Sequence, residues 1–378
     1  MKIVIAPDSF KGSLTALEVA KSIALGVRKA MPASEIVIKP MADGGEGTLQ
    51  CLVDATGGKL LYSPVKNPLG RDITAPLGIL GDGVTCVIEL AAAAGLYLIN
   101  EEERNPLHTT TYGFGQLIRA GLDLGCRRFI LGIGGSATND GGAGMLQALG
   151  FQLLDQLDQA IAFGGGALAR LKRLDNSQAD PRLNECQFIV ACDVTNPFVG
   201  PNGASHVFGP QKGATPEMVA QLDDSLRRFA DLIYQTEGIA IHDLPGTGAA
   251  GGVAGALLAF LGGQLQSGIQ IVLETTGLPD ALTGADLVIT GEGQVDYQTA
   301  QGKTPTGVAR LAKQSGIPCL VLAGSVGKGI EALYQEGVTA VFCIANKPMT
   351  LEQSMRQAPE LLAQTAEQAI RLFSHRRL

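Results

Sequence analysis

The 378-residue sequence has no cysteine framework. Its seven cysteines lie far apart and none forms a C-x-x-C pair, so the spacings typical of disulfide scaffolds and structural zinc sites are missing. An odd number of isolated cysteines indicates a reducing compartment. The four histidines are scattered as well, and we assign none of them a catalytic role.

Long apolar runs and a basic charge balance are also missing. The amino terminus, MKIVIAPD, has an apolar run of three residues, which is too short for a signal peptide. The longest apolar stretch, 249–265, is glycine-rich and shorter than the roughly 20 residues of a membrane span. A formal net charge of -7 argues against nucleic acid or an anionic membrane as the main partner. We therefore expect a cytoplasmic protein, and a small anionic ligand remains compatible with this charge.

The chain is long enough for two domains, and its two ends share one pattern. Near the amino terminus, strands at 3–5 and 35–39 alternate with helices, the first opened by a capping box of Thr15 and Glu18 and the second running from Thr48 to Gly57. Near the carboxyl terminus, strands are expected at 286–290, 318–323 and 339–345, with a helix at 304–314.

Between these ends the pattern of predicted strands and helices is different. It begins with strand-like segments that include a hairpin at Asp82-Gly83. The sequence thus predicts an α/β protein in which residues 1–65 and 285–378 form one parallel-sheet domain. A second, mixed α/β domain, 66–284, is inserted into it.

Four loops follow strands of the parallel sheet: 6–13, 40–47, 290–303 and 324–329. Ligands bind outside the carboxyl ends of such strands, so we expect these loops to share one crevice. If the inserted domain faces that crevice, its glycine-rich loop at 132–144 supplies the opposite wall. The active site is then expected in a cleft between the domains.

The loop at 132–144 reads GIGGSATNDGGAG and follows an apolar run. Its glycines let backbone N–H groups approach an anion, and a helix starting next would aim its positive end at it. A tight turn without a ligand is the plainer interpretation. A third one is a dinucleotide fingerprint, because Gly132, Gly134 and Ala137 fit G-x-G-x-x-A and Asp155 follows about 20 residues on. That match favours an NAD-linked oxidoreductase of small hydroxy acids.

The other loops carry charge on flexible backbone. Lys11 precedes a helix start and suits a phosphate group, while the two carboxylates of Asp43 and Glu46 suit Mg²⁺ or a sugar-like hydroxyl. The segment from Gly291 to Lys303 fails the Walker A pattern, because position 297 is tyrosine, but it could hold phosphates by another geometry. In each case a capped turn or a solvated side chain is the alternative.

Asp193 comes just after a predicted strand, where a metal ligand or a general base could sit. Arg71 and Arg104 could each grip a carboxylate with two hydrogen bonds, although a lone arginine is more often a surface residue.

Together, these segments resemble the bacterial-type glycerate kinase family. The segments APDSFKGS, MADGGEGT, RNPLHTTTYGFG, GIGGSATNDGGAG, ACDVTNPF, FGPQKGA, GAAGG and TGEGQVDYQTAQGKTP stand in the family's order along essentially the whole chain. The resemblance implies ATP-dependent phosphorylation of D-glycerate at the 2-hydroxyl, with Mg²⁺, on a fold with a Rossmann-like domain. Gln294 and Thr247 depart from the family's pattern and receive no role.

The residues and the resemblance together give a set of expected roles. Asp193 accepts the hydroxyl proton, with Lys11 and Asp43 as further catalytic groups. The residues expected to hold the nucleotide and its phosphates are Ser9, Gly134, Gly135, Ser136, Thr138, Asn139, Gly291, Glu292 and Lys303. Those expected to hold glycerate are Asp8, Arg71, Arg104 and Asp140, and those for Mg²⁺ are Glu46 and Glu292. The expected partners are ATP and glycerate. The remaining alternative function is a sensor that binds a carboxylate without catalysis.

Overall fold

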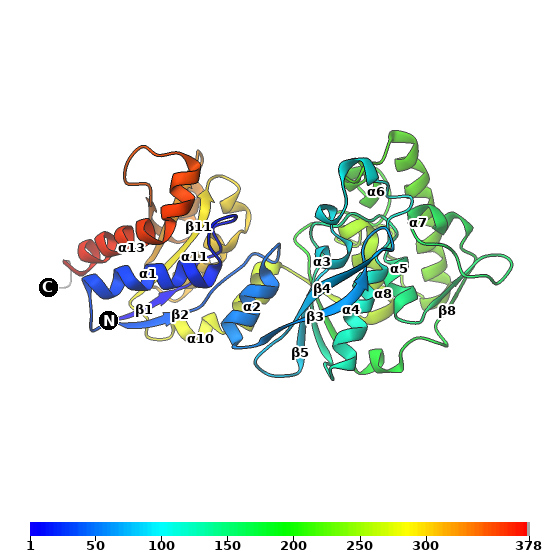
Figure 1. Ribbon diagram of the computed structural model, residues 1–378, viewed down its shortest axis with the longest axis horizontal. Coiled ribbons are helices and arrows are strands. Elements are labelled where there is room, and N and C mark those ends of the chain that lie inside the picture. The colour runs from blue at the N-terminus through cyan, green and yellow to red at the C-terminus, as the bar shows by residue number, and fades with distance from the viewer. Residues whose placement is uncertain (376–378) are drawn as a thin grey trace. The chain divides into compact units, whose positions relative to one another are not determined.

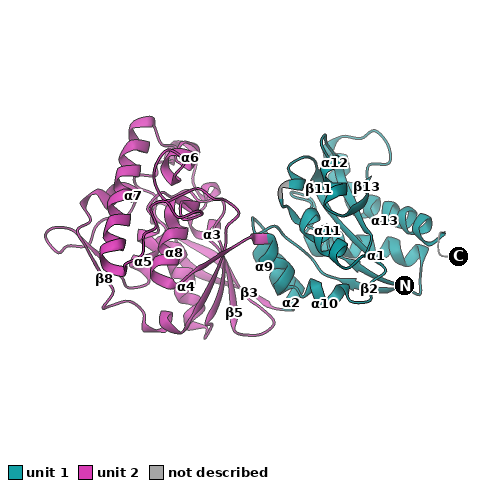
Figure 2. Ribbon diagram, turned by 180° about the vertical axis from the view of Figure 1, so that it is seen from behind, with its two compact units in different colours: residues 1–57, 269–378 teal, residues 58–268 magenta. Residues whose placement is uncertain are grey.

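A computed structural model describes residues 1–375, with only the backbone of Gln301. The chain divides into two compact units, which Figure 2 shows in different colours. Unit 1 comprises residues 1–57 and the chain from 269 onward, and unit 2 comprises residues 58–268. A parallel-sheet domain built from both chain ends, with a second α/β domain inserted, is thus confirmed.

The unit boundaries lie at 57/58 and 268/269, whereas the sequence placed them at 65/66 and 284/285. Strand β3 (Lys59–Lys66) pairs over its whole length with β4 (Asp72–Ile79) and so belongs to the sheet of unit 2. At the other boundary, Lys39 donates a hydrogen bond of 2.6 Å to the carbonyl of Thr276, which ties the end of α9 (Gly268–Thr275) to unit 1.

Unit 1 is a five-stranded parallel sheet in the order β13-β12-β11-β1-β2 (Figure 1). Its strands are β1 (Lys2–Ile5), β2 (Glu35–Ile38), β11 (Leu287–Val295), β12 (Cys319–Val326) and β13 (Val338–Cys343). Its helices are α1 (Ala16–Ala30), α2 (Thr48–Thr56), α9, α10 (Leu278–Leu282), α11 (Thr304–Gln314), α12 (Glu331–Gln335) and α13 (Leu351–His375).

The capping box of Thr15 and Glu18 starts α1 as predicted. Helix α1 then packs against α13, and Gly26 allows the close approach, because a Cβ there would lie 2.1 Å from the carbonyl oxygen of Ala363.

Two strands of unit 1 are longer than the sequence indicates, which corrects the expected loops at 290–303 and 324–329. β11 continues to Val295 and β12 to Val326, and they stay paired, with Gln294 opposite Ser325. A Cβ on Gly291 would lie 2.1 Å from the Leu322 carbonyl oxygen. The glycine that reads as a loop signal is therefore the residue that lets the two strands meet.

Unit 2 contains a six-stranded sheet in the order β10-β9-β6-β5-β4-β3. Strands β10 (Gln264–Gln266), β9 (Gln187–Ala191), β6 (Arg128–Gly132) and β5 (Thr85–Glu89) run parallel. Strand β4 is antiparallel to β5, and the edge strand β3 is antiparallel to β4. The predicted hairpin at Asp82-Gly83 joins β4 to β5. A two-stranded sheet, β7 (Gln152–Leu154) with β8 (Arg173–Asp175), stands apart.

The helices of unit 2 are α3 (Ala91–Ala94), α4 (Tyr112–Asp123), α5 (Ala143–Ala148), α6 (Ala204–Phe208), α7 (Pro216–Glu237) and α8 (Val253–Leu261). Among the described residues, no helix is long and apolar enough to cross a bilayer.

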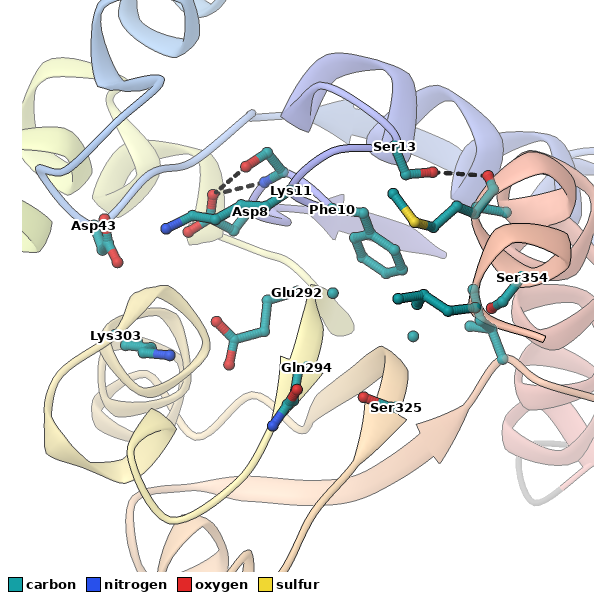
Figure 3. Close-up of a pocket in the computed structure, with 17 residues that line it drawn as sticks. Asp8, Phe10, Lys11, Ser13, Asp43, Glu292, Gln294, Lys303, Ser325 and Ser354 are labelled. Carbon is teal, nitrogen blue, oxygen red and sulfur yellow. Dashed lines mark hydrogen bonds between the residues drawn. The ribbon is translucent and has the colours of Figure 1, made fainter. Parts of the chain in front are cut away.

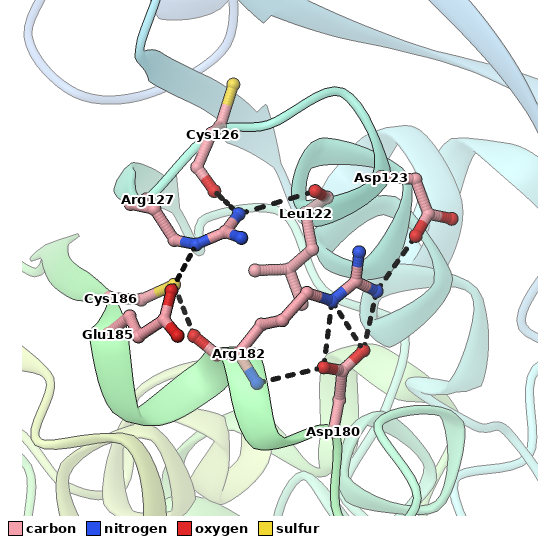
Figure 4. Close-up of polar contacts among 8 residues, drawn as sticks. All are labelled: Leu122, Asp123, Cys126, Arg127, Asp180, Arg182, Glu185 and Cys186. Carbon is pink, nitrogen blue, oxygen red and sulfur yellow. Dashed lines mark hydrogen bonds and ion pairs between the residues drawn. The ribbon is translucent and has the colours of Figure 1, made fainter.

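Figure 4 shows a cluster of polar contacts within unit 2. Arg182 binds Asp180 at 2.7 Å and Asp123, at the end of α4, at 2.8 Å. Arg127 pairs with Glu185 at 3.0 Å and also donates to the backbone carbonyl groups of Leu122, in the last turn of α4, and of Cys126, just after the helix. These contacts join α4 to the segment that leads into β9, so we interpret the cluster as structural.

Candidate functional site

Unit 1 contains a pocket of about 390 Å³ at the carboxyl ends of its strands (Figure 3). All four predicted loop segments contribute to it, together with the start of α13. The lining residues are 8–11, 13, 43, 292–294, 303, 324, 325, 344, 351, 354, 355 and 358. The structure therefore brings together six residues that the sequence selected: Asp8, Ser9, Lys11, Asp43, Glu292 and Lys303.

Asp8 lies just after β1 and is 8% exposed. Its carboxylate accepts a hydrogen bond of 2.5 Å from the Thr304 hydroxyl and one of 2.6 Å from the backbone N–H of Ser9. Burial raises the pKa of Asp8 above its usual value, and the nearby Asp43 raises it further, while the Thr304 hydrogen bond opposes the shift.

Glu292 projects from β11 and accepts a hydrogen bond of 2.5 Å from the Thr299 hydroxyl. Burial raises the pKa of Glu292 to about 7; Asp8 and Asp43 raise it further, while Thr299 and Lys303 lower it. Figure 3 shows the side chains of Asp43, Lys303 and Glu292 at one end of the pocket. The arrangement offers desolvated carboxylates beside ammonium groups, a combination suited to a metal-bound polyphosphate.

Two other predicted residues of unit 1 lie outside this lining. Glu46 is exposed and is not among the lining residues. Gly291 sits within β11, where its carbonyl accepts the Asp8 N–H at 2.8 Å. Within residues 1–375, no group of three or more His, Cys, Asp or Glu side chains is arranged to hold a metal.

In unit 2 the predicted loop 132–144 is organised around Asp140, which is 0% exposed. Its carboxylate accepts hydrogen bonds from the hydroxyl and the N–H of Thr111, each at 2.9 Å, and from the N–H groups of Gly142 and Gly144. Four donors from the chain itself occupy this carboxylate. Asp140 is thereby a support for the loop's backbone.

The rest of the loop presents both exposed backbone and buried polar atoms. Gly134 and Gly135 are exposed, whereas Ser136 is 5% exposed. The Thr138 hydroxyl and the Asn139 side-chain oxygen are buried and have no hydrogen-bond partner among the described residues. Buried polar atoms are normally paired, so these two are unusual.

Sequence analysis did not assign a role to Lys212, which is 1% exposed. Its ammonium donates a hydrogen bond of 2.6 Å to the Thr138 carbonyl. Burial lowers the pKa of Lys212 to about 7, although Asp140 raises it in part. The segment FGPQKGA shows a lysine in a predicted loop, but nothing in the sequence indicates that this lysine is buried.

The dinucleotide fingerprint at Gly132 is contradicted. Helix α5 begins only at Ala143, so the motif's glycines do not open a helix that could bind a pyrophosphate. Asp155 follows β7, outside the six-stranded sheet, where it caps a turn and pairs with Arg170 at 2.9 Å. The residue that would bind a ribose is thus occupied elsewhere.

The remaining candidates also have local partners. Both carboxylate oxygens of Asp193 accept from the N–H of Gly268, at 3.1 and 3.3 Å, where the chain leaves unit 2. Arg71 is an exposed residue that pairs with Glu103 at 2.8 Å. Arg104 lies 3.5 Å from Glu101, and its buried Nε has no hydrogen-bond partner among the described residues.

Comparison with known proteins gives a consistent result over the full length. A sequence model of the Glycerate kinase family matches residues 3–374. The "Glycerate kinase" of Haemophilus influenzae is 52% identical over 99% of both chains, and the "Glycerate 2-kinase" of Escherichia coli is 49% identical over 95% of this chain and 94% of its own. A crystal structure described as a putative glycerate kinase 2 from Salmonella typhimurium LT2 matches with a TM-score of 0.93 and 48% identity, covering 100% of both chains.

Proposed function

The chain belongs to the Glycerate kinase family, and from this premise we propose that it transfers the terminal phosphoryl group of ATP to the 2-hydroxyl of D-glycerate. The observation that carries the proposal within the structure is the pocket of unit 1. It collects three carboxylates and two lysines at the carboxyl ends of parallel strands. Phosphoryl transfer needs alignment and neutralisation of charge more than covalent chemistry, and this is what such a set of residues provides.

Mg²⁺ fits the donor chemistry of this pocket. Asp8, Asp43 and Glu292 supply carboxylate oxygens, and Mg²⁺ is usually held by one or two carboxylates plus substrate phosphates, so a complete protein cage is not needed. The raised pKa values of Asp8 and Glu292 reflect the burial of both carboxylates, which the nearby Lys11 and Lys303 offset only in part. When bound, the ion would neutralise charge on the phosphates. Glu46, being exposed and outside the lining, is the weaker candidate ligand.

The chain's own residues would then bind and orient the two substrates. In unit 1, Lys11, Lys303 and the backbone around Ser9 hold phosphate oxygens. In unit 2, the exposed backbone of Gly134 and Gly135 is free of side chains that would block an anion.

The side chain of Arg104 in unit 2 is suited to glycerate, because it offers a guanidinium to the carboxylate and its Nε lacks a partner among the described residues. Thr138 and Asn139 remain candidates for the nucleotide and its phosphates, as the sequence predicts. Arg71 remains a second candidate for the carboxylate, although it would have to break its ion pair with Glu103 to bind glycerate. Asp193 is the proposed general base, and its contact with the N–H of Gly268 would orient it.

Catalysis by residues from both units requires an active site between them, and this location remains a prediction. Glycerate is small, so an open site would risk transferring the phosphoryl group to water. Small-angle scattering with glycerate and a non-hydrolysable ATP analogue should show compaction. An unchanged radius of gyration would argue against closure.

The activity is tested by measuring ADP release with D-glycerate, Mg²⁺ and ATP, with glycerate omitted in the control. Phosphorus NMR of the product distinguishes 2-phosphoglycerate from 3-phosphoglycerate. ADP release that does not depend on glycerate would refute the kinase proposal, and 3-phosphoglycerate alone would refute the assignment of the 2-hydroxyl.

A further inference from the structure

The pocket of unit 1 has two chemically different halves. Its charged half contains Asp43, Glu292 and Lys303, and Figure 3 shows these side chains at one end, with Phe10 further along and Ser354, from α13, at the other end. The apolar lining comes from Phe10 and from four residues of the segment 344–358: Ile344, Leu351, Met355 and Ala358. A polyphosphate alone would leave this apolar half unused.

We propose that the apolar half of this pocket binds the adenine ring of ATP, with the triphosphate extending into the charged half. The inference rests on the proposed kinase function and adds a binding subsite made of Phe10, Ile344, Leu351, Met355 and Ala358. Nucleotide pockets typically combine an apolar surface for the base with a few polar groups that fix its orientation.

The floor of this subsite is part of the hydrophobic core. Phe10, Ile344 and Ala358 are 4%, 1% and 2% exposed and belong to the cluster that packs β1, β11 and β12 against α1 and α13. Because core side chains hold fixed positions, the surface offered to the ring is rigid before the ligand arrives, which reduces the entropy lost on binding.

The residues at the rim of the subsite are more exposed to solvent, and a hydrogen bond to their backbone holds the rim in place. Leu351 is 77% exposed and Met355 is half-buried. The Ser13 hydroxyl donates a hydrogen bond of 2.8 Å to the Met355 carbonyl, so the loop that carries Asp8 and Lys11 is tied to α13. An exposed leucine and a methionine at the edge of an apolar hollow gain contact area when a flat ring is placed between them.

Glycerate is a poor occupant for this half. Every heavy atom beyond its short carbon chain is an oxygen, and burying such groups against Phe10 and Ile344 would leave them without hydrogen bonds. Adenine, by contrast, presents two large apolar faces. The volume of about 390 Å³ also lies in the range typical of sites for ligands much larger than a three-carbon acid.

The chain contains no tryptophan, which allows a direct test. A Leu351→Trp variant places a single fluorophore at the rim, at a position exposed enough to accept it. We expect ADP to change its emission in a saturable way, while pyrophosphate and glycerate leave it unchanged. The matched control is Leu372→Trp, which lies on the same helix, is 69% exposed and does not line the pocket, so its emission should not respond.

A second variant reports on catalysis. Met355→Ala should raise the KM for ATP about tenfold and leave the KM for glycerate within about twofold, because a lost apolar contact of about 1.4 kcal/mol corresponds to a factor of ten. Two results together would overturn the proposal. The KM for ATP would be unchanged in Met355→Ala, and the emission of the tryptophan at 351 would not change at ADP concentrations that equilibrium dialysis shows to saturate the protein. The ADP titration does not depend on glycerate, so failure of the kinase function and failure of the adenine site are distinguishable.

Discussion

Lys212 provides the sharpest test of the electrostatics of unit 2. It is a lysine with 1% exposure whose ammonium contacts a backbone carbonyl, and it forms no ion pair with any of the described residues. Its pKa falls from 10.5 in the unfolded chain to about 7 in the folded one. Burying the charged form therefore costs stability, and the cost approaches about 5 kcal/mol at low pH.

The sign of the pH dependence follows from where each state holds the proton. Below about pH 7 both states are protonated, and above about pH 10.5 neither is. Between these values the unfolded chain binds more protons, so the free energy of unfolding rises with pH. Between about pH 7 and about pH 9 the contribution of Lys212 amounts to about 2 kcal/mol.

A Lys212→Met variant removes the titrating group and keeps much of the buried volume. Urea unfolding followed by circular dichroism at about pH 7 and about pH 9 should show that the wild type gains about 2 kcal/mol more than the variant. Lys172→Met, at an exposed position of the same unit, should behave like the wild type. Equal pH dependence in the wild type and the Lys212 variant would refute the reasoning.

Three further outcomes are expected. Gly251→Ala should lower the free energy of unfolding by about 3 kcal/mol or more, seen as a lower melting temperature, because φ is +69° and the added Cβ would lie 2.1 Å from the Thr138 carbonyl oxygen. The control, Gly238→Ala, has φ +71° and open space around the added Cβ, so it should cost only about 1 kcal/mol. Equal losses in the two variants would contradict the argument. Glu292→Gln should raise the Mg²⁺ concentration needed for half-maximal activity, measured by titration after EDTA treatment, and an unchanged requirement would remove Glu292 from the metal site. Asp193→Ala should lower kcat by about two orders of magnitude or more with a modest change in KM, whereas near-normal kcat would exclude it as the base.

Local signals in the sequence were sufficient for much of the fold. The capping box at Thr15, the glycine that ends α2 and the Asp82-Gly83 hairpin depend on contacts between near neighbours, and all three appear in the structure. The insertion of one domain into another also followed from the strand and helix pattern. The exact boundaries did not, because the assignment of β3 depends on its pairing with β4, which no local pattern specifies.

The candidate site was predictable in its acidic and basic residues but not in its supports. Asp8 and Glu292 stand out as charged residues in glycine-rich segments. Their hydrogen-bond donors are the hydroxyls of Thr304, at the start of α11, and of Thr299, in the short helical turn before it, and their roles depend on how this part of the chain packs next to β1 and β11. The burial of Lys212 was equally invisible, since a loop lysine is most often solvated.

Glu292 and Lys212 have pKa shifts of opposite sign and the same cause. Burial shifts Glu292 and Lys212 toward their neutral forms, to pKa values of about 7, in each case against the partial help of one neighbouring charge. For Glu292 the cost of holding the charged form is about 3 kcal/mol. A cation beside Glu292 would remove that cost in unit 1, and an anion near Lys212 would do the same in unit 2. The proposed Mg²⁺ is a cation, whereas ATP and glycerate are anions, so part of the binding energy would come from the counter-charges that these ligands bring to the two buried side chains.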